Sequence, residues 1–372
     1  MAALDVERFL RESWQRRPER LRGLFDAFEA PLSPEELAGL ACEPEVESRI
    51  VVESEGWKVR HGPFSAEDFA ALPEEGWSLL VHGVDRFVDG VAELLEPFRF
   101  LPNWRLDDVM VSYAPAGGSV GAHVDAYDVF LLQGVGTRRW SVESKPRAAR
   151  DLVYEPDLEI ELLKLFEPDQ SWRCEPGDVV YLPPGHAHHG VALEPSMTYS
   201  IGLRAPAPAE IAREWLDVLA AHLPDGERYR DPGRAPNDDP GLLDDAIVET
   251  TARWCRDLGA LDPERFVGAM LTRPRAAEED LFDLEALGAP AEPIEAQPLR
   301  RSAPAHFAYR PHAEGLDLFV GGRRLTLEAS ALAFVRLLCG RDRLTAERLA
   351  AHPEHHALIA QLVAAGFLSP LD

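Results

Sequence analysis

The sequence is poor in lysine and in positive charge as a whole. Only three of its 38 basic residues are lysine, and 64 acidic residues bring the formal net charge to −26. A protein that binds DNA or RNA needs clustered Lys and Arg to neutralise phosphates. The balance therefore argues against a dedicated nucleic-acid binder.

Cysteine pairs and long apolar runs are also lacking. The cysteines include no C-x-x-C pair, which argues against a disulfide framework or a cysteine zinc site, and we interpret them as buried small hydrophobic residues. Apolar runs stay short of the ~20 residues of a membrane span, and residues 1–17 lack a signal-peptide core. We therefore expect a soluble, cytoplasmic protein. The cysteines are Cys42, Cys174, Cys255 and Cys339.

The composition that is present, 46% hydrophobic and 27% charged, is globular, and the length allows two or three domains. Residues 1–205 begin with helical signals, among them a capping box at Ser33 to Glu36, and change to short β-type runs from Asp107. Such runs favour an antiparallel sandwich or a small barrel. They are DVMVSYA, DVFLLQG, TRRWSV, DVVYLPPG, HGVALE and TYSIGLRA.

Two further regions follow. Residues 206–290 carry apolar stripes at helix spacing, which predict a dimerisation module or, alternatively, packing within one chain. Residues 291–372 begin in a Pro-rich linker, which spans 288–298. Beyond it, a hairpin turn at Gly321-Gly322 and a last helix over 353–365 predict a winged-helix-like domain or a generic small α+β domain. The stripes are Ile211, Trp215, Val218 and Leu219, then Leu243, Ala246, Ile247, Thr250 and Trp254.

Two segments carry residues that could bind a metal. His123 and Asp125 form an H-x-D pair, and on a strand both side chains would leave the same face. The run from Gly177 to His188 has the spacing G-x5-P-x-G-x2-H, the second metal motif of double-stranded β-helix proteins. His186 and His189 are rival ligands on composition alone, and the spacing selects His188.

Two imidazoles and one carboxylate form the facial triad that suits a non-haem Fe(II) centre, although zinc accepts similar ligands. A second anchor favours iron. Arg138 and Arg139 follow the H-x-D segment by about one hairpin, and an Arg that points inward would bind the distal carboxylate of a keto acid in bidentate fashion. The residues alone leave open which of the two does so.

Long ordered stretches of the first 205 residues resemble the JmjC-type ribosomal oxygenases, and specifically their bacterial branch, which hydroxylates an arginine of ribosomal protein uL16. The resemblance implies an α+β chain: a double-stranded β-helix (jelly-roll, cupin-like) barrel with N-terminal helices, a helical dimerisation region and a winged helix. The stretches are WQRRP at Trp14, SPEELAGLA at Ser33, WSLLV at Trp77, LPNWRLDDVMVSY at Leu101, HVDAYDVFLLQGVGTRRW at His123, PGDVVYLPPGHAHHG at Pro176 and YSIGLRAP at Tyr199.

The resemblance also implies the chemistry and the residues that perform it. Fe(II) would be bound by His123, Asp125 and His188, and 2-oxoglutarate by Arg138, with Arg139 as the alternative if the strand register is shifted by one. Oxidative decarboxylation of the keto acid with O2 would then insert oxygen into a C–H bond of the protein substrate. The chain departs from relatives at three positions, Ala114, Ala122 and Thr198, the last where the family often has Asn.

Two other classes of function are open to the same residues. A cupin-type metalloenzyme acting on a small molecule usually shows H-x-H with a downstream Glu, whereas the second ligand here is Asp125. A non-catalytic ligand sensor with a DNA-binding winged helix would need a basic last domain. Residues 298–372 hold nine Arg against seven acidic residues, and the last helix contains neither Lys nor Arg.

The acidity is concentrated outside that last domain. Residues 1–205 carry a net charge of −16 and residues 206–297 one of −12. If the acidic groups faced the active site, they would steer a basic ribosomal protein toward it. Adaptation to salt or heat would explain the same numbers.

Overall fold

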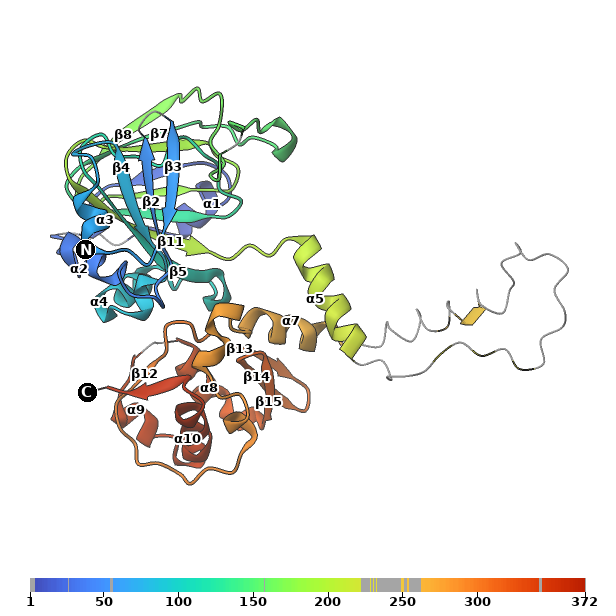
Figure 1. Cartoon of the computed structure of the whole chain (residues 1–372). Coiled ribbons are helices and arrows are strands. Elements are labelled where there is room, and N and C mark those ends of the chain that lie inside the picture. The colour runs from blue at the N-terminus through green and yellow to red at the C-terminus, as the bar shows by residue number, and fades with distance from the viewer. Residues whose placement is uncertain are drawn as a thin grey trace, which may run out of the picture. The chain divides into compact units, whose positions relative to one another are not determined.

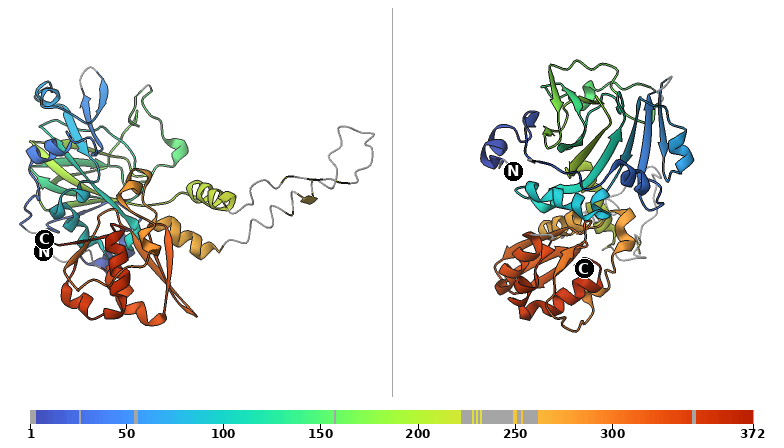
Figure 2. Two further views of the ribbon diagram at one scale, coloured as in Figure 1. Left: turned by 60° about the horizontal axis from the view of Figure 1, so that its bottom comes forward. Right: turned by 90° about the vertical axis from the view of Figure 1, so that its left-hand side faces the viewer.

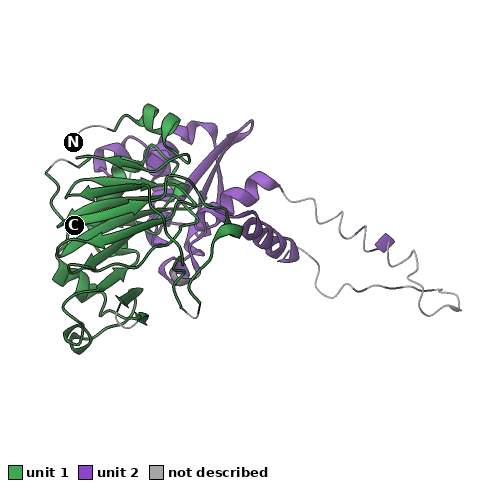
Figure 3. Ribbon diagram, turned by 90° about the horizontal axis from the view of Figure 1, so that it is seen from above, with its two compact units in different colours: residues 1–205, 299–304, 368–372 green, residues 206–298, 305–367 purple. Residues whose placement is uncertain are grey.

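The computed structural model describes residues 4–221 and 262–371, apart from 26, 54–55, 157 and 341–342, and also 228, 230, 232, 249–250 and 253. It divides into unit 1 (1–205, 299–304 and 368–372) and unit 2 (206–298 and 305–367), which Figure 3 colours separately. Within the described part, no helix is long and apolar enough to cross a membrane. Leu243, Ala246, Ile247 and Trp254 of the second predicted stripe lie outside the described residues, as does Cys255.

The described strands of residues 1–205 form two antiparallel sheets, which can be followed in Figures 1 and 2. The described strands of the large sheet run in the order β1-β9-β6-β11-β5-β4-β2-β3, and the small sheet has the order β10-β7-β8. The large sheet contains β1 (Glu19–Leu21), β2 (Ser48–Glu53), β3 (Trp57–His61), β4 (Trp77–Val81), β5 (Leu106–Ala114), β6 (Val129–Val135), β9 (Val179–Leu182) and β11 (Ser196–Leu203). The small sheet contains β7 (Arg138–Val142), β8 (Gln170–Cys174) and β10 (His188–Ala192).

Short helices precede and interrupt these strands. The predicted capping box is confirmed, since the Ser33 side chain accepts the Glu36 N–H while the Glu36 side chain accepts the Ser33 N–H. The helices are α1 (Val6–Glu12), α2 (Pro34–Leu40), α3 (Ala66–Ala70), η1 (Val84–Arg86), α4 (Asp89–Ala92), η2 (Glu93–Phe98), η3 (Asn103–Arg105) and η4 (Ala149–Asp151). Unit 1 also takes in β12 (Leu299–Arg301), which pairs with β17 (Leu368–Pro370).

Strand β6 is buried on both faces, which explains its continuous apolar sequence. Phe130 and Leu132 belong to the core that the N-terminal helices cover. Val129 and Leu131 leave the opposite face and pack with Trp140 of the small sheet. Unit 1 therefore has two apolar layers, one of which lies between its sheets.

The six β-type runs predicted from the sequence coincide with β5, β6, β7, β9, β10 and β11. The described strands of residues 1–205 pair into two separate sheets, as in a sandwich or jelly roll, and do not close into one continuous barrel. The segment before β6 makes only the isolated bridge between His123 and His188, and Gly117 and Gly121 in it adopt φ of +75° and +82°. Positive φ interrupts an extended strand, so the H-x-D pair lies beside β10 rather than on a strand of its own.

Strands β2, β3 and β4 were not among the predicted strands, because the sequence before Asp107 shows mainly helical signals. They extend the large sheet beyond β5.

One cysteine also differs from expectation: Cys42 is exposed, whereas Cys174 and Cys339 are buried.

Unit 2 contains helices and a three-stranded antiparallel sheet. The predicted hairpin is confirmed, with Gly321 and Gly322 at φ of +56° and +72° between β14 and β15. The last helix is also confirmed as η9 followed by α10, with Gly366 after it at φ +81°. The elements are α5 (Pro208–Ala221), α7 (Pro263–Thr272), η6 (Ala276–Leu281), η7 (Ala286–Gly288), β13 (Phe307–His312), β14 (Gly315–Val320), β15 (Arg323–Leu327), η8 (Ala329–Ala331), α8 (Leu332–Gly340), β16 (Arg343–Leu344), α9 (Ala346–Ala350), η9 (Pro353–His355) and α10 (His356–Ala364).

A buried carboxylate ties the N-terminal segment to the large sheet. Asp128 is fully buried and accepts hydrogen bonds from Arg105 Nη2 at 2.5 Å, Tyr181 Oη at 2.6 Å and Gln15 Nε2 at 2.9 Å. The Arg105 guanidinium also lies 5.4 Å from the centroid of the Trp14 ring. These contacts fix the start of β6, only three residues after Asp125.

We expect Asp128→Ala to lower the free energy of unfolding by about 3–5 kcal/mol, because it leaves the nearly buried Arg105 guanidinium without its anion. The matched control is Asp151→Ala, which removes an exposed partner of Arg150 and should cost less than about 1 kcal/mol. Urea unfolding followed by tryptophan fluorescence measures both. Equal losses in the two variants would contradict this role for Asp128.

Candidate metal centre

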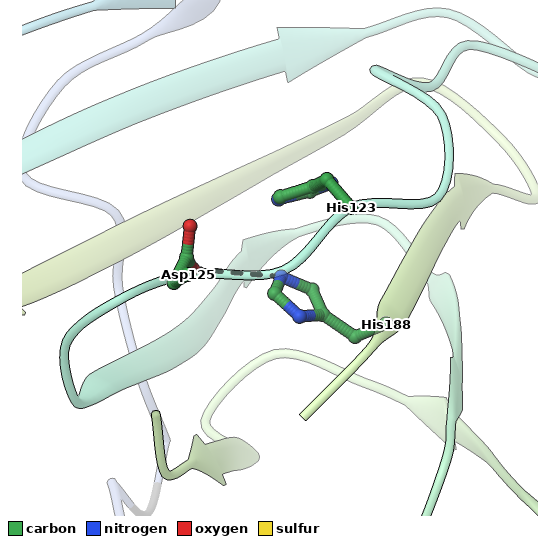
Figure 4. A group of neighbouring side chains, drawn as sticks. All are labelled: His123, Asp125 and His188. Carbon is green, nitrogen blue, oxygen red and sulfur yellow. Dashed lines mark ion pairs between the residues drawn. The ribbon is translucent and has the colours of Figure 1, made fainter. Parts of the chain in front are cut away.

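His123 and His188 are held side by side by two backbone hydrogen bonds. The N–H of each residue donates to the carbonyl of the other, at 3.1 and 3.0 Å, and the ring centroids lie 4.2 Å apart. Asp125 follows two residues later, with Oδ2 3.6 Å from Nε2 of His188. One ligand atom from each of the three side chains lies within 4.8 Å of the other two, as Figure 4 shows.

The backbone sets the orientation of both rings. His123 Nδ1 lies 3.0 Å from the carbonyl oxygen of Gly121, and His188 Nδ1 lies 3.0 Å from that of His186. A carbonyl only accepts, so each Nδ1 carries the proton and donates it. Each Nε2 then keeps its lone pair for a metal.

Burial keeps the His188 ring in the form that a metal needs. Its pKa is lowered to about 4, first by burial and next by the neighbouring His123, against the opposing effect of Asp125. The ring is therefore neutral at neutral pH. Two neutral imidazoles and one carboxylate fit a divalent transition metal and leave open positions for further ligands.

The three side chains face a cavity of about 380 Å³ between the two sheets of unit 1. The large sheet contributes residues from β2, β4, β5, β6 and β11, and the small sheet contributes Arg138 and Trp140. Residues 159–162, from the connection between β7 and β8, complete the wall. A space of this size takes a small organic co-substrate together with the end of a side chain.

Arg138 lines this cavity and forms no ion pair with a carboxylate of the described residues. The residue is only 5% exposed; its Nη1 donates to Ser112 Oγ at 3.4 Å, while Nε and Nη2 are buried without a hydrogen-bond partner among the described residues. Burial lowers its pKa to about 10, so it stays charged at neutral pH. Arg139 is exposed, since alternate residues of β7 leave opposite faces.

A buried cation without an anion is costly, so this geometry calls for an anionic ligand. Other polar atoms of the cavity wall also need a hydrogen-bond partner from a ligand. Trp140 Nε1, Ser78 Oγ and Arg49 Nε are buried and likewise lack a partner in the described part of the chain. Sequence reasoning missed these three residues; for Trp140 a signal existed, because it shares the Arg138 face of β7.

The rival ligands have other contacts and do not line the cavity. His186 Nδ1 lies 3.0 Å from the carbonyl of Glu143, and His189 Nε2 lies 2.8 Å from Ser119 Oγ. Asp128, close to the H-x-D pair, is engaged by Arg105. Thr198 does line the cavity and donates to Gln133 Oε1 at 3.1 Å.

Acidic side chains face the same cavity. Four carboxylates besides Asp125 line it: Asp107, Asp108, Glu159 and Glu161. Asp107 pairs with Arg204 at 2.9 Å, Glu159 pairs with His61, and Asp108 accepts the N–H of Gly83 at 3.2 Å. Burial together with Asp125, Asp108 and Asp107 raises the pKa of Tyr127 to about 12, which reflects the negative surroundings. The wall suits a cationic substrate group.

Comparisons with known proteins cover the part of the chain that contains this site. Residues 93–211, which include the triad and Arg138, match the model of the JmjC domain. The chain is 44% identical over 233 residues to the ribosomal protein uL16 3-hydroxylase of Escherichia coli, and 39% identical over 218 residues to a probable ribosomal oxygenase of Haemophilus influenzae. These matches cover 62% and 55% of this chain, but only 61% and 50% of the relatives' own lengths.

Solved structures match over nearly the whole chain. The ribosomal oxygenase YcfD of E. coli is 32% identical, with 99% of this chain and 98% of that chain covered and a TM-score of 0.75. YcfD in complex with cobalt and 2-oxoglutarate is 33% identical over 98% of both chains, also with a TM-score of 0.75. The chain therefore belongs to the family of JmjC-domain ribosomal oxygenases.

Proposed function

We propose that this protein is an Fe(II)- and 2-oxoglutarate-dependent dioxygenase that hydroxylates an arginine of ribosomal protein uL16. The observation that carries the proposal is the buried Arg138 guanidinium, which faces the cavity of the His-Asp-His triad without an anion of its own. A zinc hydrolase or a cupin acting on a neutral small molecule has no use for that charge.

In this proposal His123, Asp125 and His188 bind the iron, and Arg138 binds the distal carboxylate of 2-oxoglutarate. The formal charges agree, because Fe(II), Asp125 and Arg138 together carry two positive charges and 2-oxoglutarate carries two negative ones. Nε and Nη2 of Arg138 offer the paired donors that a carboxylate accepts in bidentate fashion. Trp140, whose ring lies 5.8 Å from the guanidinium carbon, restricts where that guanidinium can lie.

When bound, iron and 2-oxoglutarate supply the oxidising chemistry: O2 decarboxylates the keto acid to succinate and CO2, and its second oxygen atom enters a C–H bond of the substrate. The chain contributes binding and orientation. The backbone carbonyls of Gly121 and His186 keep both histidine rings turned toward the metal. The apolar layer between the sheets limits access of water to the cavity.

The substrate assignment is supported by the acidic wall and by the relatives. Asp107, Asp108, Glu159 and Glu161 give the cavity a negative lining that favours a guanidinium over a neutral or acidic side chain. The E. coli relative at 44% identity is named for 3-hydroxylation of uL16. A ribosomal protein as substrate also locates the reaction in the cytoplasm.

For the rest of the chain we propose the division expected from the family. Residues 1–205 are the JmjC catalytic domain, 206–290 a dimerisation region and 291–372 a linker with a winged-helix-like domain. Helices α5 and α7 pack on each other through Trp215 and Phe266, with ring centroids 4.7 Å apart. Large apolar side chains on both helices stay exposed: Ile211 at 37%, Leu216 at 61% and Val267 at 41%. A second copy of the chain would cover them.

The enzyme, supplied with Fe(II), 2-oxoglutarate and O2, should add one oxygen atom to an uL16 peptide that contains the target arginine. Intact-mass spectrometry detects this as a gain of about 16 Da, the mass of the single oxygen atom that the reaction inserts. The same peptide with Lys in place of that Arg is the control. If succinate is released normally but the mass of the peptide does not change, uL16 is not the substrate, although the protein is still a 2-oxoglutarate-dependent oxygenase.

We expect Arg138→Ala to raise KM for 2-oxoglutarate at least ~30-fold, since it removes the buried partner of a carboxylate. Arg139→Ala, on the exposed face of β7, should stay within about twofold of the wild type. Succinate release at varied 2-oxoglutarate measures both. An effect of Arg139→Ala that matches or exceeds that of Arg138→Ala would contradict the assignment.

The proposed homodimer predicts twice the chain mass in sedimentation equilibrium at micromolar concentration. Leu216→Glu should shift the mass toward the monomer, because it places a charge on an apolar surface that the partner would cover. Arg213→Glu, also on α5, is a charge-changing control. A monomeric wild-type protein would rule the dimer out.

A further inference from the structure

The segment that carries the first metal ligand runs alongside β10 without forming a strand. At one end, the Gly117 N–H donates to the Ala192 carbonyl at 2.8 Å, and the Ala192 N–H donates to the Gly118 carbonyl at 3.0 Å. At the other end is the reciprocal pair between His123 and His188. The segment is thus fastened to β10 at both ends by backbone hydrogen bonds.

Between these ends, a side-chain contact joins the segment to β10. Nε2 of His189 lies 2.8 Å from Ser119 Oγ, and no backbone hydrogen bond links residues 119–122 to β10 in the described structure. Ser119 is only 3% exposed. The Phe166 ring packs edge-on against the His189 ring, with centroids 6.0 Å apart. The contact is therefore partly shielded from water, which strengthens it.

The contact leads directly to the ring of His123. Ser119 Oγ accepts the N–H of Gly121 at 3.0 Å, and the carbonyl oxygen of Gly121 accepts the Nδ1–H of His123 at 3.0 Å. Three consecutive hydrogen bonds thus connect His189 to His123. Gly121 needs this support, because a glycine backbone has no Cβ to restrict it and can adopt many conformations other than its φ of +82°.

His189 has no direct route to the reacting groups. Side chains alternate along β10, so His188 faces the cavity while His189 leaves the opposite face of the strand. His189 and Ser119 are both absent from the cavity wall. Any effect of this pair on the metal has to pass through the position of residues 119–123.

We propose that His189 and Ser119 are positioning residues that orient His123 as a metal ligand. The proposal rests on the triad binding a divalent metal, as in the proposed function. Loss of either partner releases the Gly121 carbonyl and lets the His123 ring turn away from the direction shared with Asp125 and His188. Metal affinity then falls, although all three ligands are still present.

The test is a titration of the full-length protein with Co(II), followed by its visible absorption. His189→Phe keeps an aromatic ring against Phe166 but cannot form the hydrogen bond, and Ser119→Ala removes the other partner. We expect each variant to bind Co(II) about tenfold more weakly and with an altered visible spectrum. The double variant should bind Co(II) no more weakly than Ser119→Ala alone, since His189 acts through Ser119.

Two further variants separate positioning from general stability. His189→Gln retains a side-chain amide that reaches Ser119, so it should recover most of the Co(II) affinity and the wild-type spectrum. Asp125→Ala removes a ligand and should weaken Co(II) binding regardless of the positioning pair. The melting temperature of the metal-free variants measures any loss of fold, which by itself would not change the spectrum of bound Co(II).

Wild-type affinity and spectrum in both His189→Phe and Ser119→Ala would overturn the proposal, as would independent, additive losses in the double variant. If Asp125→Ala also bound Co(II) like the wild type, the triad itself would be wrong and the proposed function would fail with it. These outcomes distinguish failure of the positioning pair from failure of the metal centre.

Discussion

The site depends on one buried positive charge. The Arg138 guanidinium lies in the interior of the two-sheet unit, with two of its nitrogens unpaired in the described structure and no carboxylate of the chain at hydrogen-bonding distance. A charge in that position destabilises the fold unless a ligand neutralises it. In the proposed function this loss of stability keeps a binding site for an anion beside the metal, and the dianionic keto acid is the ligand that we propose for both.

The rest of unit 1 serves to place that charge and the triad around one space. Strand β7 brings Arg138 and Trp140 inward, while β10 brings His188 beside the segment of His123 and Asp125. The large sheet closes the space with β5, β6 and β11, and its far face is covered by the N-terminal helices. Asp128 joins these parts, because it lies directly before β6 and accepts hydrogen bonds from Gln15 of the N-terminal segment and Tyr181 of β9. The acidic residues that line the cavity are those that, in the proposed function, favour a cationic side chain of the substrate.

Much of this was predictable from the sequence, for local reasons. The triad residues are set by short spacings, H-x-D and G-x5-P-x-G-x2-H. Strands β5, β6, β7, β9, β10 and β11 coincide with short runs of β-type residues separated by Gly and Pro. The order of the strands within the two sheets was not predictable, because it depends on which edges pair, and the irregular path of the H-x-D segment depends on the glycine conformations at 117 and 121. Ser119 and His189 contact each other although they lie seventy residues apart in the sequence, so their contact follows from the fold alone. Strands β2 to β4 were missed because buried and exposed residues do not alternate regularly along them. In Ser48–Glu53, for example, two consecutive residues, Ile50 and Val51, are both buried.

The central claim is that the Arg138 charge exists to bind the co-substrate. A crystal structure of the protein with Mn(II) and 2-oxoglutarate, grown without oxygen, tests it most directly. The account predicts the distal carboxylate in bidentate contact with Nε and Nη2 of Arg138, at about 2.7–2.9 Å, with the metal on His123, Asp125 and His188. A carboxylate bound elsewhere, with Nε and Nη2 still unpaired, would contradict it.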